Sequence, residues 1–402
     1  MSSPALMKFV AVSHFPPLPG GSARSCALLF RGIASRGHQV ALLGPITAET
    51  AIYDKEISNP ATLSVSRYEL PHFSISQYDL NEFLRFQQIE HDQIRKILPA
   101  LIDRVKPQFV LSAHETLAGA VSEIAHAKGL PCALMLRGSP TWQIVTDIYP
   151  ADRTQQYLHL YRTADLVIPV GKYKQVGLAA RGVTDLHHIP NLLDIEMFSP
   201  GPKDRELLDR YGIPRDSIVA LHASLMQSCK RPLDVIESAV IALPQNEKLI
   251  YLFLGGGERT GELQQAARDR GLGDRVRFVR EVPYEQMPAH IRLADMVVLA
   301  SEGEGIARVY VETQACGRVL ISSDIPAGRE VIEHGRSGLL FRTGDPADLA
   351  TQVLRASTDR GLRESIGATG LERAKHHDIR RVIDSYIEAL GALRERHATT
   401  HA

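Results

Sequence analysis

Short apolar runs alternate with helix-length amphipathic segments along the first half of the chain. The run KFVAVS at 8–13 is continuous rather than alternating, which is typical of a parallel strand covered on both faces. The segment that follows it, SARSCALLFRGIASRG, predicts a helix ending at Gly37. Similar apolar runs predict further strands at 39–44, 108–113, 132–136 and 166–170.

The pattern restarts after a connection at 187–201 that is punctuated by Pro and Asn. The helix RPLDVIESAVIAL opens at Pro232, and DIRRVIDSYIEALGALRERH at 378–397 predicts a long amphipathic helix. Two successive doubly wound α/β halves follow from this order, with ligands expected at the carboxyl ends of the strands and in the cleft between the halves. The strands of the second half are expected at 217–223, in KLIYLFLGGG, and at 275–282, 296–300 and 318–324.

Charge and cysteine content narrow the class of protein. The chain has 402 residues, with 46 Lys and Arg against 46 Asp and Glu, so it lacks the basic field of a general nucleic-acid binder. Its four cysteines form no CxxC pair, which argues against a zinc site or a disulfide framework and suits a reducing cytosol. The N-terminus looks like a first strand rather than a signal peptide. No run approaches the ~18 apolar residues of a membrane span, while peripheral membrane contact stays open.

Two strand exits carry candidate anion-binding residues. After the first strand, Gly20 and Gly21 precede a helix, where backbone N–H groups can approach an anion; a tight turn that needs a positive φ is the alternative. In HASLMQSCKRP, Lys230 and Arg231 stand just before the helix that Pro232 opens. Two cations there can hold a diphosphate, and a solvated surface pair is the alternative.

The stretch SEGEGIARVYVETQACG at 301–317 carries the most specific pattern. It leaves an apolar strand through a glycine-spaced acidic loop and opens the next helix with an arginine. Arg308 and Glu312 are four residues apart, so a plain ion pair is one interpretation. An arginine at a helix N-terminus opposes the helix dipole, however, and Arg before Glu is the poorer order. An anion bound there explains the arginine, and Glu304 would then contact hydroxyls or a developing positive charge.

At these residues the chain resembles the family-4 retaining glycosyltransferases of the GT-B fold, whose signature is E-x7-E, here EGIARVYVE. The resemblance extends over FPPLPGG, IPNLLDIEMFSP, FLGGGE, DRVRFVREVPYEQM and the continuation TQACGRVLISSDIPAGREVIEHGRSGLLFRTGDPADLA. It implies two Rossmann-like domains, an acceptor domain at 1–190 and a nucleotide-sugar donor domain at 191–376. The helix at about 377–398 is expected to return to the first domain.

The resemblance also implies residue roles. Glu304 would bind hydroxyls of the transferred sugar, Glu312 the ribose of the nucleotide, and Lys230 the departing diphosphate, with Arg308 assisting Lys230. Several further positions are implied to face the donor: Gly20, Gly21, Val282, and the backbone N–H groups of Ile306, Ala307, Arg308 and Val309.

The sequence departs from the family in both halves. The loop at 222–232 lacks the usual arginine upstream of the lysine and offers Ser224 and Gln227, so Arg308 or Arg231 would have to compensate. In the first half, Arg137 stands where the family commonly has a histidine. His114 is the histidine nearest to that place, at an earlier strand end. We therefore take His114 and Arg137 as acceptor-side candidates.

The expected activity is transfer of a hexosyl or N-acetylhexosaminyl group (EC 2.4) from a UDP- or GDP-sugar to a hydroxyl, with retained anomeric configuration. The acceptor would be a glycan, a lipid-linked or a small molecule in bacterial surface-glycan or glycolipid synthesis. No D-x-D motif occurs, so no metal or other cofactor is expected, and no nucleic-acid partner is. The expected location is the cytoplasm, with peripheral contact at the inner face of the membrane left open. A GT-B nucleotide-sugar 2-epimerase, a phosphorylase and a non-catalytic nucleotide-binding member are the alternatives, which the fold alone does not separate.

Overall fold

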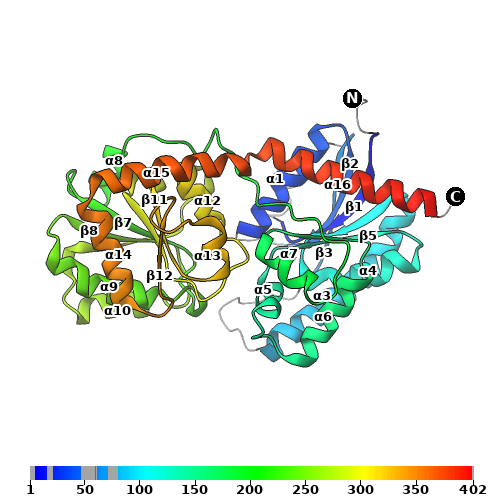
Figure 1. Cartoon of the computed structure of the whole chain (residues 1–402). Helices are drawn as coiled ribbons and strands as arrows, with labels where there is room; N and C mark the ends of the chain where they lie inside the picture. The colour runs from blue at the N-terminus through cyan, green and yellow to red at the C-terminus, as the bar shows by residue number, and fades with distance from the viewer. Residues whose placement is uncertain (1–4, 16–20, 47–58, 60, 71–79, 401–402) are drawn as a thin grey trace. The chain divides into compact units, whose positions relative to one another are not determined.

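The computed structural model describes residues 5–15, 21–46, 59, 61–70 and 80–400. Its contacts divide the chain into two units, shown in Figure 1. Unit 1 comprises Met1–Leu192 with Ile379–Ala402, and unit 2 comprises Leu193–Asp378. The sequence-based boundaries, after 190 and 376, each lie two residues before the ends at 192 and 378.

Unit 1 is built on a parallel sheet of six strands in the order β3-β2-β1-β4-β5-β6. The five strands predicted from apolar runs are present, and β3, at the sheet edge, was missed because its sequence, LSVSRY, contains no continuous apolar run. The strands are β1 (Lys8–Val12), β2 (Gln39–Pro45), β3 (Leu63–Tyr68), β4 (Phe109–Ser112), β5 (Cys132–Leu136) and β6 (Leu166–Pro169).

Helices cover both faces of the unit 1 sheet (Figure 1). One face packs against α1 (Gly21–Ser35) and the returning helix α16 (Ile379–Thr400). These two helices approach so closely that a Cβ on Gly32 would lie 2.0 Å from Cδ1 of Ile383. The other face packs against α3 (Leu80–Val105), α4 (Ala118–Ala127), α5 (Ser139–Val145), α6 (Ala151–Thr163) and α7 (Lys172–Ala179), and the short helix η1 (Glu115–Leu117) precedes α4.

Unit 2 repeats the design with a parallel sheet in the order β12-β11-β10-β7-β8-β9. The edge strand β12 was not predicted, because three residues are too few to show a periodic pattern. Its strands are β7 (Ile218–Ala223), β8 (Leu249–Leu254), β9 (Val276–Val279), β10 (Met296–Leu299), β11 (Val319–Ser323) and β12 (Leu339–Phe341). Its helices are α8 (Arg205–Arg210), η2 (Ser228–Lys230), α9 (Pro232–Ala242), η3 (Leu243–Gln245), α10 (Thr260–Asp269), η4 (Gly273–Arg275), η5 (Tyr284–Gln286), α11 (Met287–Leu293), α12 (Arg308–Ala315), α13 (Pro326–Val331), α14 (Pro346–Thr358), α15 (Arg360–Ala374) and η6 (Lys375–His377).

Each sheet has one place where the strand order reverses. In unit 1 the chain builds outward from β1 to β3 and then returns to place β4 on the other side of β1. In unit 2 it builds from β7 to β9 and returns to place β10 on the other side of β7. The loops leaving the two central strands diverge at such a switch point, and α/β proteins bind ligands there. The two switch points therefore locate where candidate residues should be sought.

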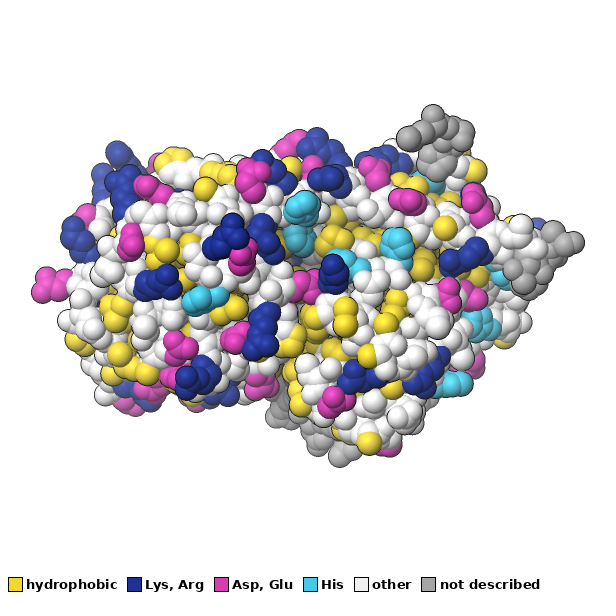
Figure 2. All heavy atoms as spheres, in the orientation of Figure 1, with side chains coloured by type: hydrophobic (Ala, Val, Ile, Leu, Met, Phe, Trp, Pro, Cys, Tyr) yellow, Lys and Arg dark blue, Asp and Glu magenta, His cyan; other side chains and the backbone are white. Residues whose placement is uncertain are grey.

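The surface agrees with the balanced composition. On the face shown in Figure 2, Lys and Arg side chains are interspersed with Asp and Glu, so no large single-sign field appears there. Within the described residues, no helix combines the length and apolar character needed to cross a bilayer.

Candidate functional site

The switch point of unit 2 brings together two segments that are far apart in the sequence. The loop after β7 carries Lys230 on η2, and the loop after β10 carries Glu304. The N–H of Glu302 donates to the carbonyl of Cys229 at 3.0 Å, which ties the two loops together. The residues that the sequence selected as catalytic candidates in these loops thus lie side by side.

Lys230 and Glu304 form an ion pair at the centre of this site. Nζ of Lys230 lies 2.5 Å from Oε1 of Glu304, and the hydroxyl of Ser301 donates to the same oxygen at 2.7 Å. The two charged side chains keep 22% and 12% of their surface, so they are shielded but reachable. A cation and a carboxylate held together at the end of two parallel strands can contact a diphosphate and a sugar, respectively.

Arg308 and Glu312 form a second ion pair on α12. Nε of Arg308 donates to Oε1 of Glu312 at 3.2 Å, and the Tyr284 hydroxyl donates to the same oxygen at 3.0 Å. The guanidinium also lies over the Tyr284 ring, with 4.7 Å from Cζ to the centroid, and donates to its hydroxyl. The plain ion pair weighed from the sequence is therefore present. Because Arg308 is only 9% exposed and engaged by these partners, its assistance to a diphosphate stays a prediction.

Two further candidates in the β7 loop, Arg231 and Ser224, are also engaged. Arg231 has a left-handed backbone (φ 47°) and pairs with Asp234 at 2.7 Å. Ser224 Oγ lies 2.8 Å from Nε2 of buried His222, whose Nδ1 lies 2.9 Å from the Val298 carbonyl. Burial lowers the pKa of His222 to about 4, so the neutral ring donates through Nδ1 and accepts from Ser224 through Nε2. The proton of Ser224 is then used within the protein, which makes this hydroxyl a poor donor to a phosphate.

Most of the remaining donor-side candidates lie in loops or at helix starts of unit 2. Ile306 is buried, Ala307 caps the N-terminus of α12, and Val309 follows in its first turn. Val282 is half-buried in the loop after β9, and Gln227 precedes η2. Their donor contacts stay predictions. In unit 1, Gly21 is the exposed first residue of α1, and Gly20 lies outside the described residues.

The glycine loop after β8 packs against the loop after β7. The N–H of Met226 donates to the Gly256 carbonyl at 2.8 Å, so the two backbones run against each other. Gly255 has a φ of +131°, and a Cβ there would lie 2.1 Å from the carbonyl oxygen of Ser224. Close backbone contact rather than ligand approach explains this glycine.

We expect Gly255→Ala to lower the free energy of unfolding by about 1–3 kcal/mol, because the change adds a clash to an unfavourable φ. Chemical denaturation monitored by circular dichroism measures the loss. The matched control is Gly261→Ala on α10, where a Cβ meets no atom within 4 Å. Equal stability of the two variants would contradict the packing argument.

The two acceptor-side candidates lie in unit 1, near its own switch point. Nε2 of His114, just after β4, is 2.8 Å from Ser22 Oγ. Arg137 follows β5, and its guanidinium donates to Oδ1 of Asn191 at 3.0 Å. Its backbone N–H donates to Glu115, a carboxylate that is fully buried beside Lys174 (3.8 Å). Arg137 is thus held from two directions, and its acceptor contact stays a prediction.

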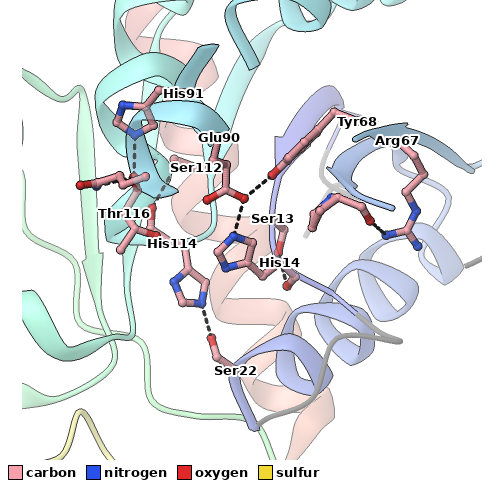
Figure 3. Close-up of polar contacts among 12 residues, drawn as sticks. Ser13, His14, Ser22, Arg67, Tyr68, Glu90, His91, Ser112, His114 and Thr116 are labelled. Atoms are coloured by element: carbon pink, nitrogen blue, oxygen red, sulfur yellow. Dashed lines mark hydrogen bonds and ion pairs between the residues drawn. The ribbon is translucent and has the colours of Figure 1, made fainter. Parts of the chain in front are cut away.

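Sequence reasoning missed several polar residues at both switch points. Ser301 and Tyr284, which bond to the two glutamates of unit 2, carried no motif of their own. In unit 1, His14 lies two residues after the end of β1 and is hydrogen bonded to Glu90 of α3 (Figure 3). A signal for Glu90 was present, because it stands four residues before Ile94 on the apolar stripe of α3. Among the described residues, no group of three or more His, Cys, Asp or Glu is arranged to hold a metal.

Comparisons with known proteins agree with the sequence resemblance. Residues 203–373 match the family model described as Glycosyl transferases group 1. A D-inositol 3-phosphate glycosyltransferase of Geodermatophilus obscurus is 30% identical over 219 residues, which cover 52% of this chain and 48% of that protein. Its counterpart in Thermobifida fusca is 29% identical over 206 residues, covering 49% and 47%. The chain spans about half the length of the curated relatives that it matches.

Solved structures resemble nearly the whole chain at low identity. HepE of Anabaena, solved with UDP and glucose, gives a TM-score of 0.77 at 17% identity and covers 96% of this chain and 100% of its own. Sucrose-phosphate synthase of Thermosynechococcus elongatus gives 0.77 at 17% identity, covering 98% and 99%. These likenesses confirm the fold class predicted from the sequence. The chain has the GT-B fold, and its residues 203–373 match the glycosyl transferases group 1 model.

Proposed function

We propose that this protein is a retaining glycosyltransferase that moves a hexosyl or N-acetylhexosaminyl group from a UDP- or GDP-sugar to a hydroxyl acceptor. The observation that carries the proposal is the Lys230–Glu304 pair at the switch point of unit 2. Both residues lie within the segment that matches the glycosyl transferases group 1 model. We further propose that the acceptor is a bacterial glycan, glycolipid or small-molecule precursor.

Lys230 and Glu304 have complementary parts in the proposed reaction. As the bond between the anomeric carbon and the diphosphate oxygen breaks, the oxygen keeps the electron pair and negative charge grows beside Lys230. Positive charge grows on the sugar, next to the Glu304 carboxylate. Fixed charges that oppose the developing ones stabilise such a transition state without reorganisation. When the donor is absent, the two side chains neutralise each other at 2.5 Å.

The second ion pair suits recognition of the nucleoside. Among the described residues, the hydrogen bonds from Arg308 and Tyr284 both reach Oε1 of Glu312. Oε2 is therefore the oxygen that we propose for a ribose hydroxyl. Arg308 and Tyr284 fix the carboxylate and hold its orientation, which reduces the ordering that nucleotide binding requires.

A donor and acceptor panel tests the proposal. Purified protein is incubated with UDP- and GDP-sugars, with and without candidate acceptors, and released nucleoside diphosphate and glycosylated product are measured by mass spectrometry. We expect diphosphate release that depends on an acceptor. Isomerisation of the donor without an acceptor would instead identify a 2-epimerase, and nucleotide binding without release would identify a non-catalytic member.

A further inference from the structure

The central strand of unit 2 ends with a buried histidine that the reaction proposed above does not use. His222 is the last residue but one of β7, is 1% exposed, and precedes the loop that carries Lys230. Nδ1 of His222 lies 2.9 Å from the Val298 carbonyl of β10, and Nε2 lies 2.8 Å from Oγ of Ser224. The ring is thus bonded on one side to the neighbouring strand and on the other to its own loop.

The bond to Val298 is made where the backbone pairing of the two strands ends. β7 and β10 are paired as far as Leu221 and Val297. One position further along, the His222 side chain supplies a hydrogen bond between the strands. Because β10 leads into the loop that carries Glu304, this bond fixes the start of that loop relative to β7.

A continuous set of hydrogen bonds leads from Ser224 to Lys230. The Ser224 hydroxyl also lies 3.1 Å from the Leu225 carbonyl, and this carbonyl accepts from the N–H of Gln227 at 2.9 Å. The Gln227 carbonyl in turn accepts from the N–H of Lys230 at 3.0 Å. The backbone of Lys230 is therefore connected to Ser224, and through Ser224 to the His222 ring.

The ring keeps a single arrangement because it is neutral. Burial lowers the pKa of His222 to about 4; the bond to the Val298 carbonyl opposes this shift, and the positive charge of Lys230 adds to it. At neutral pH the one ring proton is on Nδ1, because the Val298 carbonyl can only accept, and Nε2 accepts from Ser224. Each ring nitrogen thus makes one bond, so the two bonds can be removed separately by substitution.

We propose that His222 is a positioning residue that acts through Lys230. It links β10 to the loop after β7 and so holds the Lys230 ammonium where the departing diphosphate is expected, a role that rests on the proposed glycosyl transfer. Placement of Lys230 is important because the other cation of this loop, Arg231, is paired with Asp234. A displacement of about 1 Å at a reacting group can lower a rate by about 10²-fold.

Three variants separate the two bonds of the ring. His222→Leu removes both. His222→Asn keeps an amide donor near the place of Nδ1, which can still reach Val298, but it has no acceptor at the place of Nε2. Ser224→Ala breaks that second bond from the other side. We expect His222→Leu to lower kcat by about 10²-fold. His222→Asn and Ser224→Ala should each lower it by about 10-fold, while His222→Asn keeps near-wild-type stability.

A double-mutant cycle with Lys230→Met tests whether His222 acts through Lys230. The kcat of diphosphate release is measured with the donor and acceptor pair from the panel, and affinity for UDP and GDP is measured by calorimetry. We expect His222→Leu to lower kcat by about 10²-fold in the wild type, but by no more than about twofold in Lys230→Met. Its effect on nucleotide affinity, about 10-fold in the wild type, should likewise disappear in Lys230→Met.

His290→Leu is the matched control for loss of a buried histidine. His290 is also buried in unit 2, with Nδ1 2.8 Å from the Gln286 carbonyl and Nε2 2.7 Å from the Tyr211 hydroxyl. Neither partner belongs to the loop after β7 or the loop after β10. In chemical denaturation it should lose stability as His222→Leu does, whereas its kcat and nucleotide affinity should stay near the wild-type values.

The outcomes separate this role from the proposed function. A lowered kcat in folded, stable His222→Asn, together with loss of the His222→Leu effect in Lys230→Met, supports it. Effects that multiply in the double variant, or losses of kcat that follow stability alone in the His222 and His290 variants, overturn it. If the wild type binds UDP or GDP but transfers no sugar, the proposed function is overturned, and the cycle in nucleotide affinity decides on His222 by the same criterion. A wild type that binds neither nucleotide overturns both.

Discussion

Replacing Lys230 with Met should lower kcat for acceptor-dependent diphosphate release by about 10³-fold, the upper range for loss of one preorganised charge contact. Lys230 is the cation in the β7 loop that lies against Glu304, whereas Arg231 is paired with Asp234 and Arg308 with Glu312. The change leaves a methylene stem of similar shape, so packing is largely kept. Steady-state kinetics at saturating donor measures the loss.

Lys248→Met is the matched control for this variant. Lys248 is also in unit 2, 63% exposed, and pairs with Asp216 away from the switch point. It should leave kcat unchanged, because exposed ion pairs contribute at most about 1 kcal/mol to stability and this one faces no proposed ligand. Wild-type turnover in folded Lys230→Met would remove Lys230 from the proposed mechanism.

Glu304→Gln should reduce turnover by about 10²–10³-fold while nucleotide affinity changes much less. The amide keeps the shape and can still accept from Ser301 and Lys230, but it removes the negative charge that we propose stabilises positive charge developing on the sugar. Calorimetry with the free nucleoside diphosphate separates binding from turnover. Because Lys230 loses its counter-ion in this variant, tighter binding of the nucleoside diphosphate would also agree with the prediction.

Glu302→Gln is the control within the same loop. Glu302 is exposed, and the E-x7-E spacing selects Glu304 rather than Glu302 as the partner of Glu312. We expect near-wild-type turnover from it. Similar losses in the two variants would mean that the loop responds to net charge alone, and unchanged turnover in Glu304→Gln would exclude a catalytic role for that residue.

Most of the fold was predictable because parallel strands covered on both faces are continuously apolar. Runs such as CALML and LIYLFL are buried at every position, so the pattern is unambiguous. The two strands that escaped prediction, β3 and β12, are sheet edges. There one strand mixes polar and apolar residues and buries only its two end residues, and the other is three residues long, so neither forms a continuous apolar run.

The candidate site was predictable where spacing along the chain fixes it. The E-x7-E pattern and the strand exits located Lys230 and Glu304 at neighbouring strands. The hydrogen-bond partners of the site residues were not predictable. Arg308, for example, contacts Tyr284, which follows β9 and is remote in sequence. His14 and Glu90 likewise meet only because the β1 exit and α3 converge in three dimensions.

The measurement that tests the central claim most directly is the anomeric configuration of the product. With the donor and acceptor identified by the panel, proton NMR of the purified product shows whether the new glycosidic bond has the configuration of the donor. Retaining transfer predicts the same configuration, together with loss of product in Lys230→Met and Glu304→Gln. An inverted product, or transfer that is unaffected in both variants, would contradict the account.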